Sequence, residues 1–82
     1  MGRRDKWLRV LGSNIRNARE KKGLSQEALA SRCQSHRNYI GGVERGERNP
    51  TASKIIAIAL ALDCSVAQLF RGLNPSDLRR DG

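Results

Sequence analysis

The sequence predicts an all-α domain of five short helices. Three observations support this prediction. Apolar residues recur every three or four positions along most of the chain, which is the spacing of an amphipathic helix. Residues that begin or end helices, such as Ser25, Gly46 and Thr51, flank these segments. The chain has 82 residues, enough for only one hydrophobic core, and no pair of segments alternates as paired strands do.

We therefore expect a single domain over residues 1–82. A flexible basic arm is expected at residues 1–5, a helical core at residues 6–71 and a polar tail at residues 72–82. Apolar residues make up 38% of the chain and aromatic residues only 4%. The core should thus be aliphatic and modest, and association with a second copy would help to stabilise it.

The first expected helix covers residues 6–22. Asp5 can cap its start, and Gly23 provides a natural end. Most of the positive charge lies here, because residues 1–22 hold eight basic and two acidic residues, whereas residues 23–82 hold eight and six. The apolar stripe of this helix consists of Leu8, Leu11, Ile15 and Ala18.

Two short helices are expected next, over residues 26–32 and 37–45, with a break at residues 34–36. Ser25 can cap the first of them, and Gly46 ends the second. Two short helices joined by a tight turn form a helix-turn-helix, an arrangement in which the second helix lies in the major groove of DNA.

The last two helices are predicted from their caps. Thr51 follows Pro50 and can cap a helix over residues 52–62, and Ser65 can start a short helix from residue 66 to about residue 71. The segment 76–80 could add one more turn.

The overall charge points to an acidic partner. The net charge is +8 and the isoelectric point is near 10.8, which favours nucleic acid. No segment approaches the length of about 20 apolar residues that a membrane-spanning helix needs. Cys33 and Cys64 are isolated in the sequence, so we expect both to be buried like small hydrophobic residues and to stay reduced in a reducing compartment. We expect no metal site. His36 has no catalytic companion, so we expect a helix cap or a phosphate neighbour and no enzyme.

Two segments resemble a known family. These are LSQEALA at residues 24–30 and RNYIGGVERGERNPT at residues 37–51. They are similar to the Xre-type helix-turn-helix proteins, which include phage repressors and Cro proteins, and within that family to the controller proteins of restriction–modification systems. The resemblance covers about residues 11–70 and implies a compact five-helix fold like that of lambda repressor, a dimer, and binding to operator DNA. Gln34 departs from the family pattern, which usually has glycine in the turn.

The expected third helix has one apolar face. At 100° per residue, Val43 and Glu44 lie within about 60° of Ile40, whereas Asn38 and Arg45 lie on the other side. Arg19 likewise lies close to the apolar stripe of the first helix. Because a buried charge needs a partner, these positions predict an ion pair between Arg19 and Glu44, which the family resemblance also implies.

The outward face carries the candidate readers of DNA sequence. Arg37 and Asn38 occupy the first turn, where arginine can bond guanine and asparagine can bond adenine. The Tyr39 hydroxyl could reach a base or phosphate, or its ring could simply pack. Gly41 and Gly42 are costly inside a helix, so we expect close approach of the backbone to DNA, with a frayed helix as the alternative. Asn38 could also serve merely as a cap.

Phosphate contacts are expected around these readers. The start of the second helix offers free backbone N–H groups, and the end of the third helix continues into a polar loop. Any single member of the set could instead be an ordinary surface residue. The candidates are Ser25, Gln26, Arg45, Arg48 and Asn49.

A second apolar stripe predicts a dimer interface. Ile56 and Leu60 lie about 100–140° from the core stripe of the fourth helix, where a monomer would expose polar groups. We expect them to form a two-fold interface with Val66, Leu69 and Leu73. The alternative is that the C-terminal tail covers this stripe.

These features predict a dimeric, sequence-specific transcriptional regulator that binds double-stranded DNA at a pseudo-palindromic operator. The resemblance further implies autoregulation by a controller protein in the bacterial cytoplasm, at the nucleoid, with RNA polymerase as a further candidate partner. A prophage repressor or antitoxin with the same domain is an alternative, and a non-specific basic nucleic-acid-binding module is an alternative of another class. No cofactor, small-molecule ligand or membrane partner is expected.

Overall fold

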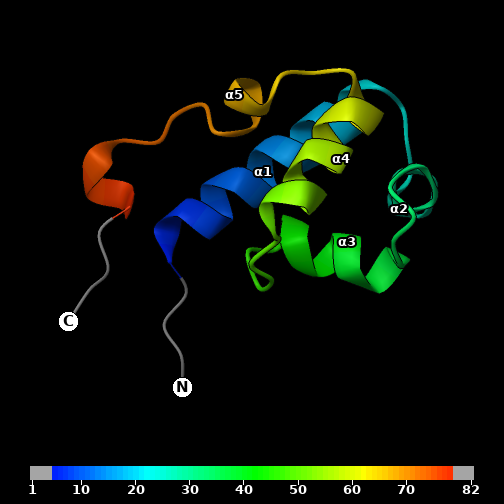
Figure 1. The fold of residues 1–82 in the computed structure, drawn as a ribbon, viewed down its shortest axis with the longest axis horizontal. Coiled ribbons are helices and arrows are strands. Elements are labelled where there is room, and N and C mark those ends of the chain that lie inside the picture. Colours follow the sequence, from blue (N-terminus) through cyan, green and yellow to red (C-terminus); the bar gives the residue numbers. More distant parts are fainter. Residues whose placement is uncertain (1–4, 79–82) are drawn as a thin grey trace.

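Five α-helices and a closing 3₁₀ turn make up the described part of the chain (Figure 1). The computed structural model describes residues 5–78, and these contain no strand. The expected arm therefore lies outside the described residues except for Asp5, as do Arg79 and Arg80 of the expected last turn. The all-α prediction is confirmed. The elements are α1 (Lys6–Lys21), α2 (Gln26–Arg32), α3 (Arg37–Glu44), α4 (Ala52–Leu62), α5 (Val66–Leu69) and η1 (Pro75–Leu78).

Side-chain caps fix where most helices begin. Ser25 Oγ accepts a hydrogen bond from the Ala28 N–H at 3.0 Å, and Thr51 Oγ1 accepts one from the Lys54 N–H at 3.2 Å. His36 caps α3, because its Nδ1 accepts from the N–H of Asn38 at 3.0 Å. Asp5 occupies the N-cap position of α1, but its side chain makes no capping hydrogen bond.

The turn between α2 and α3 contains a non-glycine residue in left-handed conformation. Gln34 has a φ of 54°, in the region that glycine adopts most easily. The turn is closed nonetheless, since the N–H of Ser35 donates to the Ala30 carbonyl at 2.8 Å. The departure from the family pattern at Gln34 therefore leaves a tight turn intact, at a cost on the order of 1 kcal/mol.

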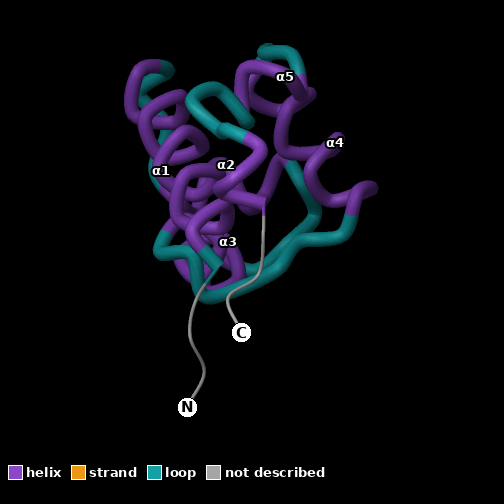
Figure 2. The backbone as a smooth tube through the Cα atoms, turned by 90° about the vertical axis from the view of Figure 1, so that its left-hand side faces the viewer, coloured by secondary structure: helices purple, strands orange, loops and turns teal. Residues whose placement is uncertain are grey.

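The core brings all five helices together. Its buried side chains include Ile15 from α1, Leu29 from α2, Ile40 from α3, Ile58 from α4 and Leu69 from α5. In both views, which share a vertical axis, α3 lies at the bottom of the molecule and α5 at the top (Figures 1 and 2). Helix α3, which is expected to face DNA, is therefore separated from α5, which lies near the second apolar stripe.

The two cysteines differ in burial. Cys33 is buried, as expected, whereas Cys64 is half-buried, and both are free thiols. Burial raises the pKa of each thiol, and the neighbouring Asp63 raises that of Cys64 further.

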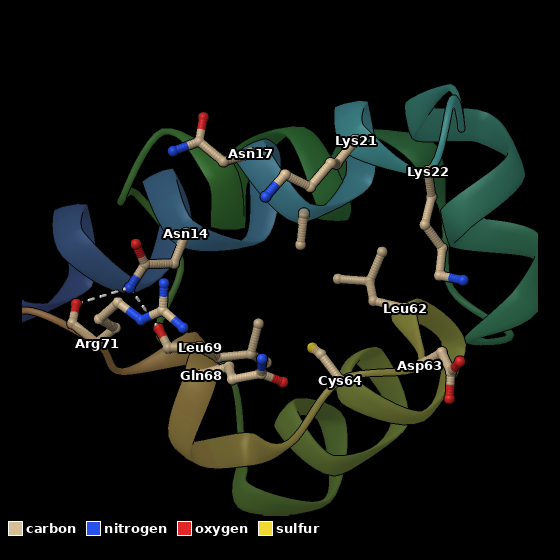
Figure 3. Close-up of a pocket in the computed structure, with 11 residues that line it drawn as sticks. Asn14, Asn17, Lys21, Lys22, Leu62, Asp63, Cys64, Gln68, Leu69 and Arg71 are labelled. Atoms are coloured by element: carbon tan, nitrogen blue, oxygen red, sulfur yellow. Dashed lines mark hydrogen bonds between the residues drawn. The ribbon is translucent and has the colours of Figure 1, made fainter.

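The chain after α5 returns along α1. Asn14 Nδ2 donates to the carbonyl oxygens of Leu69 and Arg71, at 2.8 and 2.9 Å (Figure 3). Further along, Lys6 Nζ lies 3.1 Å from Asp77 Oδ1, and a hydrogen bond from the Asn74 N–H together with Lys6 lowers the pKa of Asp77. The described part of the tail thus packs on α1 and leaves the α4 stripe uncovered.

Candidate nucleic-acid interface

Helix α3 presents one buried and one exposed face, as its sequence predicts. Ile40 and Val43 are 0% and 1% exposed, and Glu44 is buried with them. Arg37 and Asn38 are exposed in the first turn. Because α3 begins at Arg37 under the His36 cap, both side chains are held at the free end of a regular helix.

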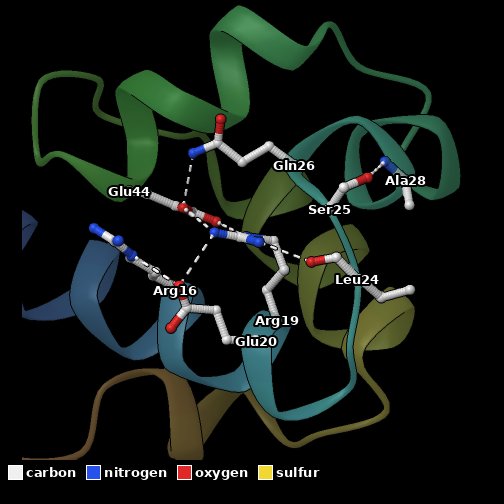
Figure 4. Close-up of polar contacts among 8 residues, drawn as sticks. All are labelled: Arg16, Arg19, Glu20, Leu24, Ser25, Gln26, Ala28 and Glu44. Carbon is white, nitrogen blue, oxygen red and sulfur yellow. Dashed lines mark hydrogen bonds and ion pairs between the residues drawn. The ribbon is translucent and has the colours of Figure 1, made fainter.

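A buried ion pair secures the other end of α3. Arg19 Nε donates to Glu44 Oε2 at 2.6 Å, and Arg19 Nη2 donates to Oε1 at 3.1 Å (Figure 4). The predicted pair is therefore present, with bidentate geometry. The hydrogen bond with Glu44 raises the pKa of the Arg19 guanidinium, against the effect of burial. Arg19 Nη1 also donates to the Leu24 carbonyl at 2.7 Å.

The pair extends to the start of α2 through Gln26. Gln26 Nε2 donates to Glu44 Oε1 at 3.0 Å, so one carboxylate links side chains from α1 and α2 to α3 (Figure 4). No described buried side-chain nitrogen or oxygen in residues 5–78 lacks a hydrogen-bond partner. The network therefore fixes the position of both short helices relative to α1.

The role of Gln26 in this network was not foreseen from the sequence. Its position at the start of α2 predicts a phosphate contact, whereas helical periodicity indicates only that Arg19 and Glu44 both point inward. No spacing rule connects Gln26 to a residue eighteen positions away, so only the packing of α2 against α3 reveals the contact.

Side chains of the chain itself cover the two glycines of α3. A Cβ atom on Gly42 would lie 2.7 Å from Arg48 Cγ, and one on Gly41 would lie 3.0 Å from Arg45 Nη1. Both glycines are buried. The exposed side chains of Arg45 and Arg48 occupy the space beside these glycines, so DNA can approach this backbone only when those side chains move. The close approach of DNA stays a prediction. The helix is also regular rather than frayed.

Gly42 makes room for an arginine that packs on Tyr39. The Arg48 guanidinium carbon lies 5.5 Å from the centre of the Tyr39 ring, within the range of a cation–π contact. Burial raises the pKa of the Tyr39 hydroxyl, and Arg48 acts in the opposite direction. Arg48 is thus held against α3 instead of extending freely from the loop.

The phosphate candidates come together from two segments. At Gly41, an added Cβ would be 3.0 Å from Arg45 and 3.5 Å from Gln26 Oε1, so the start of α2 and the end of α3 adjoin. Arg45 Nε also lies 3.1 Å from Glu47 Oε1. The other three candidates, Ser25, Arg48 and Asn49, are exposed.

The candidates for a dimer interface fall into two groups. Ile56, Leu60 and Val66 are 50%, 76% and 39% exposed, and Leu73 is half-buried. Leu69 is only 1% exposed and belongs to the core of its own chain. Its assignment to the interface is therefore wrong, because α5 is one turn long and turns Leu69 towards α1.

A short helix, a tight turn and a second helix with an exposed, polar start define a helix-turn-helix domain of the DNA-binding kind. The chain belongs to the helix-turn-helix family HTH_3, whose model matches residues 15–69. Members of this family are DNA-binding transcription regulators, and this chain is one of them, not an enzyme.

Relatives and solved structures agree with this assignment. Control protein C.SmaI from Serratia marcescens is 50% identical over 61 residues, which are 74% of this chain and 73% of that protein. The restriction–modification controller protein C.AhdI from Aeromonas hydrophila superimposes with a TM-score of 0.75 at 46% identity, covering 77% of this chain and 96% of that one. The DNA-binding domain of the P22 C2 repressor gives a TM-score of 0.72 at 32% identity, covering 76% and 82%.

Three further findings follow. The resemblance to controller proteins is confirmed, and the five-helix architecture is that of phage repressor domains. Among the described residues, no helix has the length and apolar character needed to cross a membrane.

Proposed function

We propose that the protein is a dimeric, sequence-specific regulator that places α3 of each subunit in successive major grooves of a pseudo-palindromic operator, about 34–36 Å apart. The observation that carries this proposal is the exposed start of α3. Arg37 and Asn38 project from a helix whose opposite face is fixed by the core and by the pair between Arg19 and Glu44. A rigid support of this kind suits side chains that must meet base edges.

The proposed contacts divide into two groups. Arg37 and Asn38 read base edges, and Tyr39 contributes its hydroxyl beside them. Positively charged and N–H groups around α3 contact phosphates and set the position of the helix on the duplex. The phosphate group comprises Ser25, Gln26, Arg45, Arg48 and Asn49.

Replacing Asn38 by alanine should separate base reading from phosphate binding. We expect Asn38→Ala to weaken binding to an operator selected from a random DNA pool by about 1–3 kcal/mol and to relax the preference at one base pair. Arg48→Ala should weaken operator and random DNA alike. Fluorescence anisotropy with both duplexes at one salt concentration measures the difference. Equal losses on the two duplexes for Asn38→Ala would remove it from the reading group.

The exposed stripe of α4 and α5 supports the dimer. Ile56, Leu60 and Val66 form an apolar surface that the described tail does not cover. A soluble regulator gains stability by burying such a surface against a second copy. Leu73, which is half-buried, lies close in sequence to α5 and joins this group.

The dimer can be tested with one charge. We expect Leu60→Lys to give monomers in analytical ultracentrifugation, because two like charges would face each other across a two-fold interface. Ser31→Lys, at an exposed position on α2, adds the same charge away from α4 and α5 and should leave the association unchanged. A fully dimeric Leu60→Lys protein would place the interface elsewhere.

The regulatory role follows the relatives. C.SmaI is named as a control protein and C.AhdI as a restriction–modification controller. We propose that this chain likewise controls expression of a restriction–modification system, acting in the cytoplasm at the nucleoid and regulating its own promoter, with RNA polymerase as a partner. A reporter gene under an operator selected from a random DNA pool tests this role. Binding of the protein to that operator without any change in transcription of the reporter would contradict it.

A further inference from the structure

A groove lies between the C-terminal half of α1, the end of α4 and the helix α5 (Figure 3). Its volume is about 540 Å³, within the usual range for ligand-binding pockets. The lining mixes cations, amides and a small apolar surface. The cations are Lys21, Lys22 and Arg71, the amides are Asn14, Asn17 and Gln68, and the apolar residues are Ala18, Leu62, Cys64 and Leu69.

The cations of this groove have no carboxylate partner within residues 5–78. Neither Lys21, Lys22 nor Arg71 forms an ion pair there, whereas Arg16 and Arg45 elsewhere on the surface each pair with a glutamate. Asp63 is the acidic residue among those that line the groove. The groove therefore carries three cations against one carboxylate, and its lining keeps an excess of positive charge.

The groove lies away from the surface proposed to meet DNA, and it shares the α5 segment with the proposed dimer surface, because Val66 and Leu73 are each two residues from a lining residue. It adjoins α5, at the opposite end of the molecule from α3 (Figures 1 and 2). Leu60 and Leu62 are two positions apart on α4, so they point about 200° apart, and the lining residue Leu62 is directed away from the exposed Leu60. If the proposed function holds, the groove stays clear of the DNA while α3 is bound to its operator.

We propose that this groove binds an acidic segment of a partner protein. Carboxylates of the segment meet Lys21, Lys22 and Arg71, and an apolar side chain between them rests on Ala18 and Cys64. An extended acidic segment fits the layout of the groove better than a small anion does. Lys22 and Arg71 lie at opposite ends of the hollow, and Lys21 and Gln68 lie across from each other between them (Figure 3). Charges spread along an open groove match several carboxylates on an extended chain.

The apolar part of the lining favours a segment that also carries an apolar side chain. Ala18 and Cys64 are half-buried and form its accessible part, while Leu62 and Leu69 are buried beneath them. An acidic stretch without an apolar residue would leave this surface unfilled. The partner sequence is thus expected to combine aspartate or glutamate with a leucine-like side chain.

The test uses the full chain and a fluorescein-labelled peptide of repeating Asp-Asp-Leu. We expect this peptide to bind and to shift the backbone amide resonances of Ala18, Leu62 and Gln68, whereas an Asn-Asn-Leu peptide does neither. The variant Lys21→Gln with Arg71→Gln should bind the acidic peptide about fivefold to tenfold more weakly, which is the size expected for two exposed ion pairs. The variant Arg16→Gln with Arg32→Gln removes the same charge outside the groove and should change binding less than about twofold.

Four results would overturn the proposal. They are equal losses for the two double variants, resonance shifts confined to α3, shifts produced equally well by inorganic phosphate, and groove shifts that depend on protein concentration without peptide, which would mean that a second copy covers the groove. Operator binding measured on the same samples separates the two proposals. If the natural chain bound its operator but not the acidic peptide, the groove site would be ruled out and the DNA-binding function would stand.

Discussion

Replacing Glu44 by alanine is expected to lower the free energy of unfolding by about 3–5 kcal/mol. The substitution leaves the buried Arg19 guanidinium without its carboxylate and removes the acceptor of Gln26. A domain of this size has a total stability on the order of 4–12 kcal/mol, so a large fraction of the molecules would unfold under mild denaturant. Urea unfolding followed by circular dichroism measures the shift, at one protein concentration because dimerisation contributes to stability.

A double variant shows whether the loss comes from an unpaired charge. Arg19→Met with Glu44→Leu removes both charges and keeps apolar volume, and we expect it to recover most of the stability lost in Glu44→Ala. Glu20→Ala is the control for α1, since Glu20 is exposed and lies only at the edge of the network, 3.9 Å from Arg19. A Glu44→Ala protein as stable as this control would show that the network does not hold α3.

A second large loss is expected for Gly12→Ala. Helices α1 and α3 cross at this glycine, and an added Cβ would lie 2.6 Å from the carbonyl oxygen of Glu44 and overlap that of Val43. These are backbone atoms, so the two helices would have to separate. We expect a net loss of at least about 2 kcal/mol in stability, although alanine is the better helix former.

The matched control lies one residue further along the same helix. Ser13 is exposed, so Ser13→Ala should change the free energy of unfolding by less than about 0.5 kcal/mol. Thermal and urea unfolding of the two variants give the comparison. If Gly12→Ala were as stable as Ser13→Ala, the close crossing of α1 and α3 would be contradicted.

Local rules predict most of the helix boundaries. Ser25, Thr51 and Ser65 each accept the hydrogen bond that their position indicates, because capping depends on residues close together in sequence. The inward direction of Ile40 and Glu44 is also local, since it depends only on helical periodicity. The ion pair followed because two buried opposite charges have few other solutions.

Contacts between elements are where the sequence alone falls short. The periodicity of α1 does not show that Gly12 touches the backbone of α3, or that Asn14 binds the end of α5. The assignment of Leu69 to the interface is wrong because the buried face of a one-turn helix depends on the elements that pack against it. Nor does the sequence show that Arg48 and Arg45, which follow in the same chain, fill the space beside the glycines of α3.

The central claim is that the outer face of α3 reads base sequence. Selection of bound duplexes from a random DNA pool tests it most directly, with the natural chain and Asn38→Ala run in parallel. We predict a two-fold symmetric motif with half-sites one helical turn apart for the natural chain, and loss of one position in each half-site for the variant. Enrichment of no motif, or of the same motif by both proteins, would contradict the account.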